Sequence, residues 1–151
     1  MSVYEYAMKF KNKYPGTIAW RIKKHCDVIE KYLNPDEVVS YAFVAQKNHH
    51  SYEIFRTFAV AVTNKRIILA QKRLLFGYLF ISITPEMYND IKLASSIIWG
   101  KVSIDTVKEV VVLSNLDKNA LPEIETEISQ PMMAMKEEKQ KTDNSNIESN
   151  A

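Results

Sequence analysis

Residues 58–71 carry the pattern that most narrows the folds open to this chain. Bulky and small apolar side chains alternate through the first half of the stretch, which is typical of a strand in the middle of a sheet. The bulky positions are Phe58, Val60 and Val62, and the small ones are Ala59 and Ala61. A polar tetrad, residues 63–66, follows, in which Asn64 tolerates positive φ, and a β-branched run begins at Ile67. The stretch predicts a central hairpin with one bulky face and one thin face.

Five further segments show strand-like alternation. The first begins near Glu37 and continues through Ala45. The others follow the hairpin and are separated by turn residues: 78–84, 91–99, 102–106 and 109–114. Seven short strands at a spacing of about ten residues are typical of an antiparallel sandwich or barrel. We therefore predict a mainly β fold of the α+β kind.

Helical periodicity precedes the strands. Residues 3–13 predict a short helix that ends at Pro15 and Gly16. From Thr17, a suitable N-cap, to Tyr32, apolar residues recur at helical spacing and basic residues occupy another face. The apolar positions are Ile18, Ile22, Cys26, Ile29 and Leu33, and the exposed basic ones are Arg21, Lys23, Lys24 and Lys31.

A second helical pattern follows the last predicted strand. Asn119 can cap this helix, and Pro122 suits its first turn. Its apolar face consists of Leu121, Ile124 and Ile128. Pro131 should end or kink the helix, and from Lys136 the chain is almost wholly polar. We expect three parts: an N-terminal helical extension (residues 1–33), a β domain (34–131) and a polar, disordered tail (132–151).

Composition argues against several classes of function. Three glycines leave no glycine-rich phosphate loop, and the single cysteine, Cys26, leaves no intramolecular disulfide. No Cys/His cluster has zinc spacing, and no nucleophile elbow or paired-carboxylate spacing occurs, so we expect no enzymatic activity, metal or cofactor. Lys and Arg interrupt the apolar runs, and the N-terminal residues lack a secretory pattern. We expect a cytoplasmic protein.

Charge is distributed unevenly along the chain. Residues 1–33 carry seven Lys/Arg against three Asp/Glu, whereas residues 117–151 carry four against eight. A front-to-back charge difference of this kind can steer a partner or an oligomer. It can also be ordinary solvated surface, and the sequence leaves both interpretations open.

Several local sequences stand out within this order of elements. They are LNPDE at 33–37, VTNKRII at 62–68, GKVSIDT at 100–106, and the pair Asn115 and Leu116. Together with seven strands followed by one helix, they resemble the bacterial pleckstrin-homology-like (PH-like) domains, specifically the YokE-like group, over about residues 33–130. The resemblance implies a seven-stranded antiparallel sandwich or half-open barrel capped by a C-terminal α-helix, here with an extra N-terminal α-helix. It also implies no enzymatic activity.

Basic residues in three turns form the predicted site. In a PH-like sandwich the turns after strands one, three and six gather at the end away from the C-terminal helix. The residues concerned are Lys47, His49, His50, Arg56, Lys72, Arg73 and Lys108. Because Lys and Arg recognise phosphate through charge-assisted hydrogen bonds, these residues would form a pocket for phosphate or a lipid headgroup. The alternative is solvated charge on unrelated loops.

Other residues have plainer explanations. The pair His49 and His50 has no further ligands to close a metal site, so we expect no metal. Cys26 lies on an apolar helix face and is expected to be buried. The aromatic residues, Trp20 and Trp99 among them, occur at spacings that core packing explains, so no nucleic acid is expected. The cluster Met132, Met133 and Met135 is either an adaptable partner surface or a cover over the sheet edge.

The sequence therefore predicts a non-enzymatic interaction module. It would bind a protein partner, or a second copy of itself, through strand edges and the C-terminal helix region. The alternative is a headgroup-binding protein at an anionic membrane surface, which would use the basic turns and the basic first helix. The expected location is cytoplasmic, and in the second case peripheral to the membrane.

Overall fold

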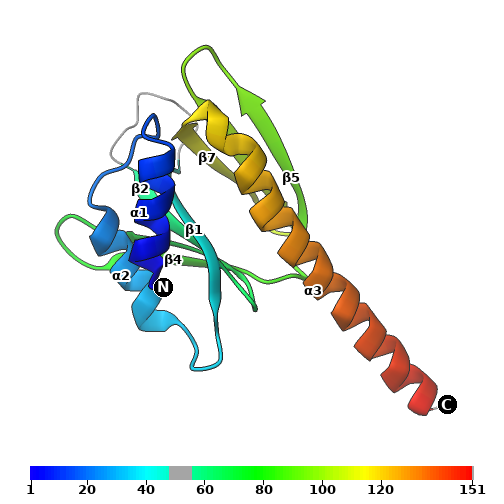
Figure 1. The fold of residues 1–151 in the computed structure, drawn as a ribbon. Coiled ribbons are helices and arrows are strands. Elements are labelled where there is room, and N and C mark those ends of the chain that lie inside the picture. The colour runs from blue at the N-terminus through cyan, green and yellow to red at the C-terminus, as the bar shows by residue number, and fades with distance from the viewer. Residues whose placement is uncertain (48–55, 151) are drawn as a thin grey trace.

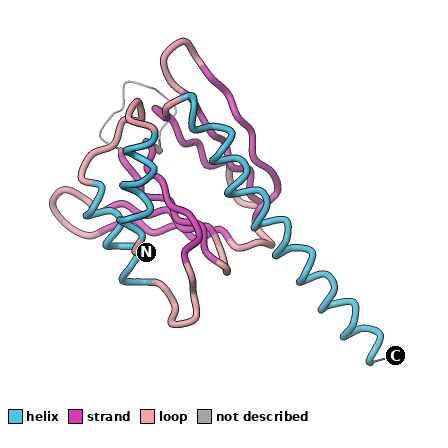
Figure 2. Tube along the Cα trace, viewed as in Figure 1, coloured by secondary structure: helices cyan, strands magenta, loops and turns pink. Residues whose placement is uncertain are grey.

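The structure, a computed structural model, describes residues 1–47 and 56–150. Two helices come first, α1 (Val3–Lys13) and α2 (Ile22–Tyr32). The strands are β1 (Val39–Gln46), β2 (Thr57–Thr63), β3 (Ile67–Lys72), β4 (Tyr78–Ile83), β5 (Tyr88–Ser95), β6 (Gly100–Thr106) and β7 (Val110–Leu116). A short 3-10 helix, η1 (Lys118–Ala120), leads into α3 (Leu121–Ser149). Figures 1 and 2 show α1 and α2 beside β1–β4, and α3 running along β5.

The strands form one antiparallel sheet in the order β4-β3-β2-β1-β7-β6-β5. Within the described residues, β1 and β7 are joined through one residue pair, Gln46 with Ser114. Neighbouring strands elsewhere pair over four residues or more, so the sheet is divided at this junction into the halves β1–β4 and β5–β7. Seven antiparallel strands followed by a helix confirm the fold predicted from the sequence.

The central hairpin has the two faces that its alternation predicts. β2 pairs with β3 through four residue pairs, and every residue of β2 is buried. On the thin face, the register aligns Ala59 with Ala70, and Ala70 with Phe80 of β4. The ring of Tyr32 in α2 lies 5.6 Å from the Phe80 ring, centroid to centroid. α2 therefore covers the thin face, where small side chains let a helix approach closely.

α1 packs along β1 through aromatic side chains. The Phe10 ring lies within 6.3 Å, between centroids, of the rings of Tyr14, Tyr41 and Phe43. The Tyr41 hydroxyl donates to a Glu123 carboxylate oxygen of α3 at 2.9 Å. The Lys13 ammonium lies 2.5 Å from the other oxygen of the same carboxylate. α1 therefore links the edge of β1 to α3.

The extra N-terminal segment contains two helices, and the second starts later than the sequence predicts. α2 begins at Ile22, preceded by Arg21 with φ of 53°. Thr17, the predicted N-cap, instead accepts a hydrogen bond on Oγ1 from the Asp117 backbone N–H at 2.9 Å. The Ile18 N–H bonds to the Asn115 carbonyl at 2.9 Å. These bonds tie residues 17 and 18 to the end of β7. The Trp20 N–H, which a Thr17 N-cap would accept, donates instead to Thr57 Oγ1 at 3.1 Å.

α3 is longer than the sequence predicts. Its buried face consists of Leu121, Ile124, Ile128 and Met132. Proline in a helix interior costs about 3 kcal/mol, yet the helix continues through Pro131 because Met132 extends the i, i+4 row of buried side chains. The predicted end of the helix at Pro131 is therefore wrong, while the alternative, a kink at Pro131, stays a prediction. Residues 132–149 are helical where the sequence predicts a disordered tail. Beyond Met135 the side chains are mostly exposed, and Figure 1 shows this part of α3 extending past the strands.

The sequence LNPDE and the tetrad at 63–66 contact each other at one end of the hairpin through hydrogen bonds and ion pairs. The Asn64 side chain accepts from the Val38 N–H at 2.7 Å and donates to the Asp36 carbonyl at 3.2 Å. The Lys65 ammonium lies 3.1 Å from the Asp36 carboxylate. Arg66 makes two 3.0 Å hydrogen bonds to the two oxygens of Glu37. These contacts between LNPDE and the tetrad, which both belong to the family resemblance, therefore fix how the chain enters the sheet.

Candidate anion-binding groove

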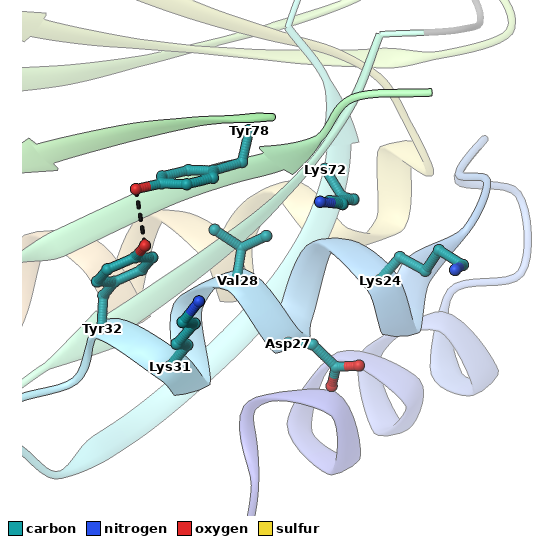
Figure 3. Close-up of a pocket in the computed structure, with 7 residues that line it drawn as sticks. All are labelled: Lys24, Asp27, Val28, Lys31, Tyr32, Lys72 and Tyr78. Carbon is teal, nitrogen blue, oxygen red and sulfur yellow. Dashed lines mark hydrogen bonds between the residues drawn. The ribbon is translucent and has the colours of Figure 1, made fainter. Parts of the chain in front are cut away.

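A groove runs between α2 and the β3–β4 hairpin. Its inner part is a cavity of about 250 Å³, lined by Lys24, Asp27, Val28, Lys31, Tyr32, Lys72 and Tyr78 (Figure 3). Tyr32 donates a 2.7 Å hydrogen bond to the Tyr78 hydroxyl, and the two rings lie 5.2 Å apart. This bond raises the pKa of Tyr78. The tyrosine pair joins the C-terminal end of α2 to the start of β4.

Three ammonium groups belong to this cavity. Lys24 and Lys31 come from α2, and Lys72 comes from the end of β3. The cavity includes one carboxylate, Asp27, which Lys23 contacts at 2.9 and 3.1 Å, and Figure 3 shows Asp27 directed away from Tyr78. Since Asp27 has its own cation, the cavity keeps a net positive charge.

A second cavity, of about 430 Å³, continues from Lys72 toward the β1–β2 end of the sheet. Its lining comprises Trp20, Arg21, His25, Arg56, Thr57, Gln71, Lys72, Arg73 and Leu74. Arg21 donates from Nη1 to the Lys72 carbonyl at 3.2 Å. The Lys72 N–H donates to His25 Nδ1 at 2.9 Å. We call the two cavities together the basic groove; its cations are Arg21, Lys24, Lys31, Arg56, Lys72 and Arg73.

His25, which lines the groove, makes the stability of the folded chain depend on pH. Burial, and then the charge of Arg21, lowers the pKa of His25 from 6.5 to about 4. The unfolded chain therefore binds this proton more readily than the folded chain does. The stabilisation that neutral His25 contributes is complete above pH 6.5 and is lost as the pH falls toward 4.

We expect the free energy of unfolding to fall when the pH is lowered from about 7 to about 5. The His25→Gln variant, which keeps an acceptor for the Lys72 N–H, should show a flatter pH dependence. Urea unfolding at several pH values measures both slopes. Equal slopes in the two proteins would show that His25 does not carry the effect.

Comparison with known proteins places this architecture in a family. A profile of the bacterial PH domain matches residues 33–130. The chain belongs to the bacterial PH domain family. The match does not separate the YokE-like group from the rest of the family, so that assignment stays a prediction. Members of this family are generally interaction modules without enzymatic activity. Among curated proteins, none matched the chain.

Two solved structures resemble this PH domain. One is a DUF1696 family protein with a pleckstrin-homology domain from Shewanella loihica, with 14% sequence identity and a TM-score of 0.51, covering 78% of this chain and 98% of that one. The other is a pleckstrin-homology domain from Shewanella amazonensis, with 13% identity and a TM-score of 0.40, covering 66% and 76% respectively. The first supports the fold alone.

The PH domain brings together part of the predicted site. Arg56, Lys72 and Arg73 line the same cavity. The Lys47 N–H bonds to the Arg56 carbonyl, but its ammonium lies over the Phe58 ring, 5.9 Å from the centroid. His49 and His50 lie outside the described residues.

Lys108 does not join this group. It lies in the β6–β7 turn, beside the pair of Asp105 with Val110. That is the end of β7 opposite to Ser114, through which β7 meets β1. The predicted gathering of all three turns is therefore wrong for Lys108.

The site predicted from the sequence did not include three cations of the groove, although the membrane-binding alternative used the basic first helix that carries them. Arg21, Lys24 and Lys31 were predicted as an exposed basic helix face, and that pattern was their only signal. Their role depends on α2 packing beside β3 and β4, which the helix pattern alone does not specify.

The other predicted residues have mainly structural surroundings. Met132 is fully buried and Met135 packs against the core, whereas Met133 is 48% exposed. The methionines therefore do not form a continuous partner surface. Burial raises the pKa of Cys26 to about 12, so its thiol is a poor nucleophile.

Among the described residues, no group of three or more His, Cys, Asp or Glu side chains is placed to hold a metal ion. Across residues 1–47 and 56–150, no helix has both the length and the hydrophobicity needed to cross a membrane.

Proposed function

We propose that this PH domain is a non-enzymatic module that binds phosphate-bearing anions through the basic groove. The observation that carries the proposal is the convergence of cations from α2, β3 and the β1–β2 connection along two adjoining cavities. Among the described residues, no carboxylate forms an ion pair with Lys24, Lys31 or Lys72. Ammonium groups left without carboxylate partners are available to bind an external anion.

The shape of the groove suits individual phosphate groups. Val28 is buried in its floor, and the Tyr32–Tyr78 pair closes one end, so an anion would enter between two fixed walls. Partial enclosure strengthens charge interactions, because water screens them less. Phosphate groups of lipid headgroups and of soluble metabolites share this chemistry.

The groove can be tested with pyrophosphate. Calorimetric titration of the full chain at low salt should detect binding that weakens as salt is added. The Lys72→Glu variant should bind about ten- to a hundredfold more weakly, because it removes one charged hydrogen bond and adds repulsion. The Lys72 backbone makes the contacts to Arg21 and His25, so this side-chain change should leave the fold intact.

Lys108→Glu is the matched control, because it makes the same charge change in a turn away from the groove. Its affinity for pyrophosphate should equal that of the unmodified chain. Equal losses in the two variants would show that binding depends on overall charge and would contradict the proposal. Absence of pyrophosphate binding at low salt would also contradict it.

A second candidate is association with a protein partner or a second copy through a sheet edge. β5 is the last strand of the sheet and is mostly exposed, with Leu93 41% exposed. Open strand edges can pair with another chain. Light scattering after size-exclusion chromatography tests self-association directly, and a monomeric mass would exclude it under those conditions.

A further inference from the structure

The turn between β3 and β4 carries three adjacent exposed apolar side chains. Leu74 is 78% exposed, Leu75 85% and Phe76 86%. The turn is nevertheless closed, because the Arg73 N–H donates to the Gly77 carbonyl at 3.1 Å. Gly77 has φ of +76°, which suits glycine at the end of such a hairpin loop. We call residues 74–76 the apolar tip.

The apolar tip lies directly beside the basic groove. Lys72 and Arg73 precede it in sequence, and Leu74 itself lines the larger cavity. Trp20, 52% exposed, lines the same cavity. In Figure 1 the β3–β4 turn extends past α2, on the side of the molecule away from the C-terminal end of α3. Apolar side chains therefore project next to cations, as they do in proteins that insert into anionic membranes.

We infer that the apolar tip inserts into an anionic lipid bilayer, so that the phosphates held by the basic groove are those of lipid headgroups. This inference rests on the proposed function and deepens it. Charge complementarity favours a membrane. In a bilayer the lipid phosphates lie immediately outside the acyl chains, and in this chain Lys72 and Arg73 immediately precede the apolar tip. The tip is a projecting turn, and fluid lipid can receive it without a preformed pocket.

Co-sedimentation with vesicles tests the inference on the full chain. Vesicles of phosphatidylcholine with about 30% phosphatidylglycerol should bind the protein, and pure phosphatidylcholine should bind it weakly. The double variant Leu75→Ser/Phe76→Ser should partition at least about tenfold less onto the anionic vesicles, because two large apolar groups are lost from the inserted turn. Val107→Ser is the control, since Val107 is 63% exposed in the β6–β7 turn.

Pyrophosphate binding distinguishes anion binding by the basic groove from membrane insertion by the apolar tip. The double variant should keep the pyrophosphate affinity of the unmodified chain, because its cations are unchanged. If the unmodified chain binds pyrophosphate but not anionic vesicles, the groove proposal stands and insertion is wrong; a soluble phosphate or a protein partner would then be the occupant. If it binds neither, both proposals fail.

A fluorescent probe reports insertion directly. The Leu75→Cys variant can be labelled selectively with an NBD dye, since Cys26 is fully buried. Its emission should shift to the blue on addition of anionic vesicles, whereas labelled Val107→Cys should not change. An unshifted spectrum at position 75 with bound vesicles would overturn the inference. So would unchanged vesicle binding by the Leu75→Ser/Phe76→Ser variant, or loss of its pyrophosphate affinity.

Discussion

Replacing Arg66 with alanine is expected to lower the free energy of unfolding by about 3–5 kcal/mol. The Glu37 side chain is fully buried, and Arg66 bonds to both of its oxygens at 3.0 Å. Thr63 donates to the same carboxylate at 2.7 Å. Removing Arg66 leaves a buried carboxylate with too few partners, which costs far more than an exposed ion pair contributes.

Urea denaturation followed by circular dichroism measures this effect. The matched control is Lys65→Ala, the neighbouring residue, whose ion pair with Asp36 is largely exposed. That variant should unfold at nearly the same urea concentration as the unmodified chain. If both variants unfold alike, the burial of Glu37 is not what makes Arg66 important.

Acid sensitivity should change in the same variant. Burial pushes the pKa of Glu37 upward, but hydrogen bonds from Arg66 and Thr63 outweigh burial and hold the pKa below 4.5. The resulting stabilisation is present above the unfolded pKa and is lost as pH falls through the lower folded value. Without Arg66 the pKa of Glu37 should rise, so acid unfolding should begin at a higher pH.

Ile128→Ala is expected to lower the free energy of unfolding by about 2–5 kcal/mol. Ile128 is fully buried between Ile124 and Met132 on the face of α3 that packs against the sheet. Truncation removes buried methyl groups and leaves a cavity that rigid neighbours fill only in part.

Ile147→Ala makes the same chemical change further along the same helix, where the side chain is 68% exposed. Its urea midpoint should match that of the unmodified chain. A comparable loss in both variants would mean that the distal half of α3 packs against the domain. An unchanged midpoint in Ile128→Ala would mean that α3 does not contribute to the core.

The sheet could be predicted because the alternation of side chains within each segment agrees with the strand that the segment forms. Alternation at 58–62 fixes which side chains share a face, and a slip of one residue would turn Phe58, Val60 and Val62 toward the thin face, where α2 leaves little room for them. The alternation also predicted a thin face, although not that α2 would cover it. Register between segments far apart in sequence, such as Gln46 with Ser114, depends on tertiary packing that local patterns do not contain.

The start of α2 and the end of α3 were predicted less well, because both depend on contacts made in the folded chain. Thr17 has the chemistry of an N-cap, but its hydroxyl is bonded to the Asp117 N–H in the folded chain. Pro131 usually ends a helix, but the burial of Met132 one residue later favours continuation. In both cases a contact made after folding overrides a local preference.

The groove was predicted only in part. Arg56, Lys72 and Arg73 belong to turns whose proximity follows from strand order. Lys24 and Lys31 join them because α2 packs beside β4, a contact made through Tyr32 and Tyr78. The apolar tip was visible in the sequence as Leu74, Leu75 and Phe76, but only the structure shows that all three are exposed.

A pyrophosphate titration followed by ¹H–¹⁵N NMR is the decisive test of anion binding in the basic groove, because it locates the bound anion on the chain. The basic groove predicts that the largest saturable shifts fall at Lys24, Lys31, Lys72 and Arg73, with the Lys108 amide almost unchanged. Shifts spread evenly over all lysines, or centred on the β6–β7 turn, would contradict the assignment of this groove as the anion-binding site.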